Sequence, residues 1–372
     1  MTTVGCHGLS NMITCILGTR AQLIKMAPVI RAIEDRGWAF CLTLTGQHRE
    51  SIDDIIRDFG ILTRPRYLYN GPEINGIFQM LAWAWRCWRV FRRSPELYLP
   101  VSAGQPNLVL IHGDTFSTIL GLVLARARSV RVAHVESGLR SFRTLHPFPE
   151  ELTRLVVMRF AHIAFCPGAW ALNNASRNPR LECIDTCHNT LMDALRIAQA
   201  RSQESKTMAP EQRYGVCSIH RFENVFFKWR LRRIVNLVCE MAGQYPIMFV
   251  LHPVTRRRLE RTGFIARLRA CPNISLIDRM GYIEFITLLK GSAFVVTDGG
   301  GNQEELSYLG IPTLLMRKAT ERQEGLGATV TIGNYSRDAA LAFLKQLRPS
   351  LQINIDAGIS PAGIIVDHLG RL

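Results

Sequence analysis

The chain has 372 residues, of which 47% are hydrophobic and 20% charged, and this balance excludes an intrinsically disordered protein. Because domains usually hold roughly 100–200 residues, the length predicts two of them. The formal net charge of +15 favours an anionic ligand.

The basic residues do not gather as a nucleic-acid-binding surface requires. Clusters such as Arg92–Arg93 and Arg256–Arg258 lie on predicted amphipathic helices, where a solvated face explains them. We therefore expect no nucleic-acid partner, although the charge keeps that alternative open. No apolar run reaches the ~20 residues that a bilayer span needs, so we expect no membrane span.

The cysteine pattern favours a cytoplasmic protein with reduced thiols. Ten cysteines are present without a CxxC pair, and no signal peptide precedes them. Cys183, Cys187 and His188 lack the second pair of ligands that a zinc site needs, so no metal is expected.

The first half alternates apolar runs with amphipathic stretches. The predicted strands are 11–17, 40–44, 107–111, 130–135 and 163–166, and the predicted helices are 23–36 and 118–127. Such alternation is typical of a parallel sheet, which binds its ligand at the carboxyl ends of the strands. Residues 78–93 form a Trp-rich basic helix that we expect to pack within the domain or against a second copy. A membrane surface is the alternative for this helix.

A polar stretch, 201–212, separates a second alternating series. Its predicted strands are 214–219, 247–251, 274–276, 294–297 and 313–316, and a helix is predicted at 234–241. We predict an α/β fold of two Rossmann-like domains facing a central cleft, spanning residues 1–188 and 189–360. The segment 361–372 is expected to be a helix that packs back on the first domain.

Two strand ends have the features of phosphate sites. Gly18 and Arg20 follow the first strand, and Lys25 lies on the next helix. In the second half, Asp298 and Gly299–Gly301 stand between a strand and a helix, where bare backbone and a helix N-terminus favour a diphosphate. Glu305 lies one turn further on, within reach of ribose hydroxyls in this interpretation. A plain flexible turn is the alternative.

Ionisable groups collect at further strand ends. Asp114, Glu136 and Glu150 follow strands of the first half, and His220 follows one of the second. Several carboxylates at one sheet edge favour acid and base chemistry. The simpler alternative is that Asp114 and His220 only cap helices.

Eight motifs in order resemble the bacterial UDP-N-acetylglucosamine 2-epimerase family: GTRAQLIKMAPV, TGQH, HGDT, HVESGLRS, PFPEELTR, HRFEN, TDGGGNQEE and ATERQEG. The resemblance implies the GT-B-like fold and a reaction without metal or cofactor. In that reaction UDP-GlcNAc loses its C2 proton and UDP, which gives 2-acetamidoglucal. Re-addition of UDP then yields UDP-ManNAc, whereas capture by water yields ManNAc.

The resemblance also implies a role for each matched residue. Asp114, Glu136, Glu150 and His220 match catalytic positions. The matched substrate-binding positions are Arg20, Lys25, Arg140, Arg154, Gly299, Gly300, Gly301, Glu305 and Arg322. Gln47 and His252 match positions at which some members bind a second, activating UDP-GlcNAc.

Three departures from the family pattern concern the phosphate and hinge elements. Ala21–Gln22 stands for the usual Pro-Glu, so we expect a carboxylate to be missing near the phosphate corner. Gly299 stands for a serine, which removes a hydroxyl donor to the diphosphate. Cys187–His188–Asn189 stands for Thr-Gly-Asn, so His188 is expected at a backbone position that favours positive φ.

The leading hypothesis is a non-hydrolysing UDP-GlcNAc 2-epimerase for surface-polysaccharide synthesis, acting as a cytoplasmic homodimer. A hydrolysing enzyme that releases ManNAc is the alternative, and the substituents at C4 and C6 of the sugar stay open. A glycosyltransferase of the same fold and a catalytically silent sugar-nucleotide sensor are further alternatives.

Overall fold

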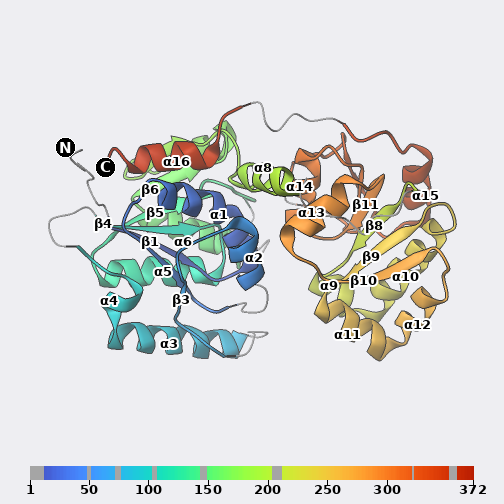
Figure 1. Ribbon diagram of the computed structural model, residues 1–372, viewed down its shortest axis with the longest axis horizontal. Coiled ribbons are helices and arrows are strands. Elements are labelled where there is room, and N and C mark those ends of the chain that lie inside the picture. The colour runs from blue at the N-terminus through green and yellow to red at the C-terminus, as the bar shows by residue number, and fades with distance from the viewer. Residues whose placement is uncertain are drawn as a thin grey trace, which may run out of the picture. The chain divides into compact units, whose positions relative to one another are not determined.

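The computed structural model describes residues 12–47, 52–71, 77–102, 107–142, 149–202, 212–320, 322–351 and 358–372. Two compact units make up the chain, the first of residues 1–197 with 358–372 and the second of residues 198–357 (Figure 1). Motif residues His48, Pro147, Phe148 and Glu321, the start of the predicted first strand at Asn11, and residues 203–211 of the polar stretch lie outside the described residues.

The first unit is built on a seven-stranded parallel sheet in the order β3-β2-β1-β4-β5-β6-β7. Its strands are β1 (Met12–Leu17), β2 (Phe40–Leu44), β3 (Arg66–Tyr67), β4 (Asn107–His112), β5 (Arg131–Val135), β6 (Ile163–Cys166) and β7 (Glu182–Asp185). The central strands are buried along almost their whole length, as parallel strands covered by helices require.

Helices cover this sheet and carry the chain from one strand to the next. They are α1 (Arg20–Asp35), α2 (Ile52–Phe59), α3 (Ile77–Arg93), α4 (Pro95–Tyr98), α5 (Phe116–Ala127), α6 (Glu150–Phe160), α7 (Ala169–Ala175), α8 (Leu191–Ser202) and α16 (Pro361–Leu369). The terminal helix α16 lies beside α1, as predicted (Figure 1). Asp193 of α8 holds the first turn of α16, because it accepts hydrogen bonds from Ser360 Oγ at 3.0 Å and from the backbone N–H of Ala362 at 2.7 Å.

The Trp-rich helix α3 divides its aromatic side chains between core and surface. Trp83 is buried, and its indole N–H donates to the carbonyl of Thr45 at 2.9 Å. Trp88 packs partly buried against the core, and Trp85 is 57% exposed with Arg89 over its ring. None of the described helices has the length and apolar composition that crossing a membrane requires.

The second unit contains a six-stranded parallel sheet in the order β10-β9-β8-β11-β12-β13. Its strands are β8 (Gly215–Ser218), β9 (Ile247–Leu251), β10 (Ile274–Asp278), β11 (Phe294–Thr297), β12 (Thr313–Leu315) and β13 (Val330–Ile332). Its helices are α9 (Phe222–Val225), α10 (Lys228–Met241), α11 (Pro253–Thr262), α12 (Phe264–Arg269), α13 (Tyr282–Lys290), α14 (Gly300–Tyr308) and α15 (Arg337–Lys345).

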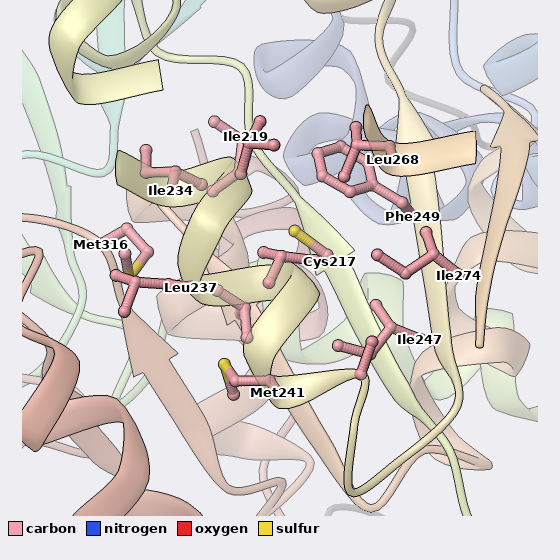
Figure 2. Packing of buried hydrophobic residues seen from close by; sticks show 14 of the residues in the cluster. Cys217, Ile219, Ile234, Leu237, Met241, Ile247, Phe249, Leu268, Ile274 and Met316 are labelled. Atoms are coloured by element: carbon pink, nitrogen blue, oxygen red, sulfur yellow. The ribbon is translucent and has the colours of Figure 1, made fainter. Parts of the chain in front are cut away.

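The core of this unit lies between the sheet and α10. Figure 2 shows Leu237 and Met241 of α10 against Cys217 of β8 and Ile247 of β9, all of which are buried. Apolar burial of this kind contributes roughly 25 cal/mol per Å² and anchors the strands whose ends carry the site.

The departure at Cys187–His188–Asn189 does not act as predicted. The residue with positive φ in this turn is Cys187, at 62°, and not His188. Asp185 holds the turn, because its Oδ1 accepts hydrogen bonds from the backbone N–H groups of Cys187 at 2.7 Å and Gly168 at 3.1 Å. The expectation that His188 replaces a left-handed glycine is therefore wrong by one residue.

Candidate functional site

In the first unit, the predicted carboxylates follow neighbouring strands. His112 at the end of β4 pairs in register with Val135 at the end of β5, so Asp114 and Glu136 emerge at the same sheet edge. Asp114 does not cap a helix, because the N-cap of α5 is Thr115. The alternative of a plain capping aspartate is therefore excluded.

Glu136 lies at the centre of a buried charged cluster. Its two carboxylate oxygens lie 2.8 and 3.0 Å from Lys25 Nζ, and its Oε2 lies 3.0 Å from His112 Nε2. The side chains of Lys25 and Glu136 are only 7% and 8% exposed. Glu136 has a φ of 63°, a strained conformation that residues at functional sites often retain.

A second histidine supports the same edge in its neutral form. Burial lowers the pKa of His134 to about 4 from its ordinary value of 6.5, and a hydrogen bond with the Gly113 carbonyl offsets this only in part. That carbonyl lies 2.8 Å from Nε2 and can only accept, so Nε2 carries the proton and Nδ1 accepts from Ser137 Oγ at 3.0 Å. His134 thus fixes the loop between His112 and Asp114.

Asp114 belongs to a chain of ion pairs that the motifs did not reveal. Arg154 of α6 bonds Asp114 and lies 3.6 Å from Glu151, which in turn accepts from Arg140 Nε at 2.5 Å. Glu151 is fully buried; burial acts to raise its pKa, but hydrogen bonds from Arg140 and Ser141 hold the pKa below its usual range. Glu150, the predicted catalytic residue, is the first residue of α6 and is partly exposed.

Gln22, which stands for the usual glutamate of the family, has a structural role in this chain. The side chain is buried; its Oε1 accepts from the N–H groups of Gly18 and Thr19, and its Nε2 donates to the His112 carbonyl at 2.6 Å. Gln22 therefore completes the capping box of α1 and ties that helix to the end of β4. A carboxylate at this position would face the His112 carbonyl oxygen, so this contact favours Gln22 over a glutamate.

Two further predicted residues of the first unit have local partners. Arg20 lies 2.6 Å from Asp54 of α2, and both side chains are about a quarter exposed or less. Gln47 accepts a hydrogen bond from Ser117 Oγ at 2.7 Å. Both lie in or next to loops at the carboxyl ends of β1 and β2.

In the second unit, the glycine run forms the start of a helix. β11 ends at Thr297, Gly299 is the N-cap of α14, and Gly300 and Gly301 form its first turn. Among the residues that the structure describes, no side chain caps this helix, so its first N–H groups and the positive end of the helix dipole favour an anion.

The helix α14 also anchors the loop that carries Arg322. Gln303 is buried and donates from Nε2 to the carbonyls of Arg322 and Glu324, and Glu304 Oε2 lies 2.5 Å from Arg322 Nη1. Glu305 is buried in the second turn of the helix. Gln303 and Glu304 belong to the motif TDGGGNQEE, and Arg322 belongs to the motif ATERQEG. Only the fold brings these two motifs into contact.

His220 lies next to the glycine run. The N-cap of α9 is Arg221, so the alternative that His220 merely caps this helix is excluded. The ring of His252 packs against that of His220 with centroids 4.7 Å apart. Asp298 is completely buried beneath them and accepts from the backbone N–H groups of His220 and Arg221, both at 3.0 Å.

No cluster of three or more His, Cys, Asp or Glu side chains within the described ranges could hold a metal ion. Cys183, Cys187 and His188 are among the residues that form no such cluster. All cysteines that the structure describes are free thiols.

Known proteins are similar to this chain over most of its length. A family model described as UDP-N-acetylglucosamine 2-epimerase matches residues 31–352. A UDP-N-acetylglucosamine 2-epimerase of Methanocaldococcus jannaschii is 32% identical over 87% of this chain and 88% of that protein. A UDP-2,3-diacetamido-2,3-dideoxy-D-glucuronate 2-epimerase of Pseudomonas aeruginosa is 30% identical over 86% of this chain and 88% of that protein.

Solved structures confirm the predicted fold class. The M. jannaschii UDP-GlcNAc 2-epimerase in complex with UDP-GlcNAc and UDP is 27% identical, with a TM-score of 0.78 over 97% of this chain and 100% of that chain. The Neisseria meningitidis enzyme bound to UDP-GlcNAc, at 24% identity and a TM-score of 0.80 over 97% and 100%, supports the fold alone. The chain therefore belongs to the UDP-N-acetylglucosamine 2-epimerase family.

Proposed function

We propose that the protein is a non-hydrolysing UDP-N-acetylglucosamine 2-epimerase that interconverts UDP-GlcNAc and UDP-ManNAc for surface-polysaccharide synthesis. The observation that carries this proposal is the buried cluster of Lys25, His112 and Glu136 beside Asp114. A carboxylate held in a fixed position near a second carboxylate suits the removal of a weakly acidic proton next to a sugar C1.

The first unit carries the proton transfers in this proposal. One carboxylate of Asp114, Glu136 and Glu150 removes the proton from C2 while the C1–O bond to UDP breaks, and C1 and C2 become joined by a double bond. Protonation of C2 on the opposite face, with re-addition of UDP to C1, gives the epimer. Lys25 and Arg154 hold Glu136 and Asp114 in place for these steps.

The second unit binds the uridine diphosphate. The first-turn N–H groups of α14 at Gly299–Gly301 take the diphosphate, and Glu305 takes the ribose hydroxyls. These donors stabilise the charge that develops on the departing UDP. Arg20, Arg140 and Arg322 add positive charge near the substrate, and His220 acts on the leaving group or the sugar.

The sugar itself is the least constrained part of the proposal. The P. aeruginosa relative, named for a UDP-2,3-diacetamido-dideoxyglucuronate, is about as similar as the relatives named for UDP-GlcNAc. A modified UDP-2-acetamido sugar is therefore the second candidate substrate. The homodimer, the cytoplasmic location and an activating site at Gln47 and His252 stay predictions.

Product analysis tests the proposal. The purified protein is incubated with UDP-GlcNAc and followed by ¹H and ³¹P NMR. We expect UDP-ManNAc to accumulate to a constant ratio without free UDP. Free UDP rising in step with ManNAc would identify the hydrolysing enzyme, and transfer that depends on an acceptor would identify a glycosyltransferase. Turnover of the diacetamido glucuronate alone would identify the second substrate.

A further inference from the structure

The absence of a side chain at Gly299 creates the space that the His220 ring occupies. A Cβ placed on Gly299 would lie 2.7 Å from His220 Cε1 and 3.1 Å from Nε2, closer than carbon atoms approach without movement. Gly299 has an ordinary φ of −79°, so the backbone conformation does not call for glycine here. The close approach of the ring is the remaining reason.

Asp298 holds His220 from the other side. Its Oδ1 lies 3.5 Å from His220 Nδ1 and accepts the backbone N–H of the same residue at 3.0 Å. Asn224 Nδ2 donates to Oδ2 at 3.0 Å, and Tyr335 in turn donates to Asn224 Oδ1 at 2.7 Å. A completely buried carboxylate with this many fixed donors is a rigid support for an imidazole.

The ring is thus confined on three faces. Asp298 faces Nδ1, the His252 ring packs against one side, and the bare Gly299 backbone lies under Cε1 and Nε2. This arrangement leaves Nε2 beside the uncapped first turn of α14. The serine that the family usually carries at this position would compete with the ring for the same space.

We propose that Asp298 and Gly299 are positioning residues that set the place of His220 over the N-terminus of α14. The expected effect on turnover rests on the proposed function, whereas the position of the His220 ring does not depend on it. In this chain the imidazole of His220 therefore lies where a side chain at residue 299 would stand.

The test uses the full-length Gly299→Ala and Gly299→Ser variants. Because the added atoms meet the ring of His220 and not backbone, both variants should fold once that ring shifts. We expect the His220 ring to be displaced in a crystal structure and its imidazole NMR signals to shift. Gly301→Ala is the matched control, because a Cβ there meets nothing within 4 Å, and it should leave those signals in place.

Kinetics then separate positioning from a general structural effect. With UDP-GlcNAc, Gly299→Ala should lower kcat by about 10²-fold while UDP affinity changes much less. In a His220→Gln background the same change should have almost no further effect, since the two residues act together. An equal loss of kcat in both backgrounds would overturn the proposal, as would a ring that stays in place in Gly299→Ala.

The test still decides the proposal if the Gly299→Ala variant does not fold or if the wild-type protein is inactive. If Gly299→Ala fails to fold, the double variant with His220→Ala removes the obstructing ring and should restore Tm; no restoration contradicts the proposal. If the wild-type protein turns over no UDP-sugar, the proposed function fails, but the ring displacement still confirms or refutes the positioning.

Discussion

Lys25 Nζ lies 2.8 Å from Glu136 Oε1, although the two residues are 111 positions apart in the chain. Both side chains are almost fully buried. A buried charge is tolerated only where it has a partner of opposite charge. Loss of this contact should therefore affect the stability of the first unit as well as its proposed chemistry.

The first prediction concerns the stability of that pair. Lys25→Met removes the ammonium group from beside a buried carboxylate and should lower the free energy of unfolding by about 3–5 kcal/mol in denaturant titration. Adding Glu136→Gln should recover a large part of the loss. The surface pair Arg31–Asp35 is the control, since Asp35→Asn should cost less than about 1 kcal/mol. Equal losses at both pairs would refute the buried role of Lys25.

Asp114→Asn should abolish turnover while UDP binding persists. The amide keeps the shape of the side chain and a contact with Arg154 but cannot accept or release the substrate proton. We expect kcat to fall by about 10²–10⁴-fold with little change in the Kd for UDP, measured by calorimetry. Weakened UDP binding with a normal kcat for the bound fraction would contradict the assigned role.

The stability of the protein should depend on pH through His134. Its folded pKa of about 4 lies below its ordinary value of 6.5, so the unfolded chain takes up the proton first as the pH falls. Unfolding free energy should drop by up to about 3 kcal/mol between pH 6.5 and 4 from this residue. His134→Gln should remove that part of the slope; an unchanged slope would show that another group is responsible.

Gln22→Glu, which restores the residue usual in the family, should destabilise this chain. The new carboxylate oxygen would lie against the His112 carbonyl in place of an N–H donor. We expect a loss of about 1–3 kcal/mol at neutral pH. The exposed Gln244→Glu is the matched control for the added charge and should be nearly neutral. If Gln22→Glu is as harmless as the control, Gln22 does not tie α1 to β4.

Most strands that the sequence predicted have apolar runs that are buried on both faces; the edge strand β10, in which only Ile274 is buried, is the exception. The edge strands β3, β7 and β13 escaped prediction because they are short and partly polar; β7 begins with the exposed Glu182, and β3 has two residues. These edge strands have two to four residues, which is too short for an apolar pattern to identify them.

At the site, the positions of Asp114 and Glu136 just after two strands predicted that these residues lie at the same sheet edge, because the carboxyl ends of parallel strands meet there. The partners of those residues were not predictable. Glu151, one residue after the expected catalytic Glu150, lies one turn before Arg154 on α6 but meets Arg140 only through tertiary packing. The same holds for Asp298 beneath His220, which the motif presents as part of a glycine loop.

Exchange of the C2 hydrogen of UDP-GlcNAc tests the central claim most directly. The wild-type protein and Glu136→Gln are incubated with the substrate in D₂O, and the C2 signal is followed by ¹H NMR. We predict deuterium at C2 in both epimers with the wild type and exchange slower by about 10²-fold or more with the variant. Binding of UDP-GlcNAc without any exchange in the wild type would contradict the account.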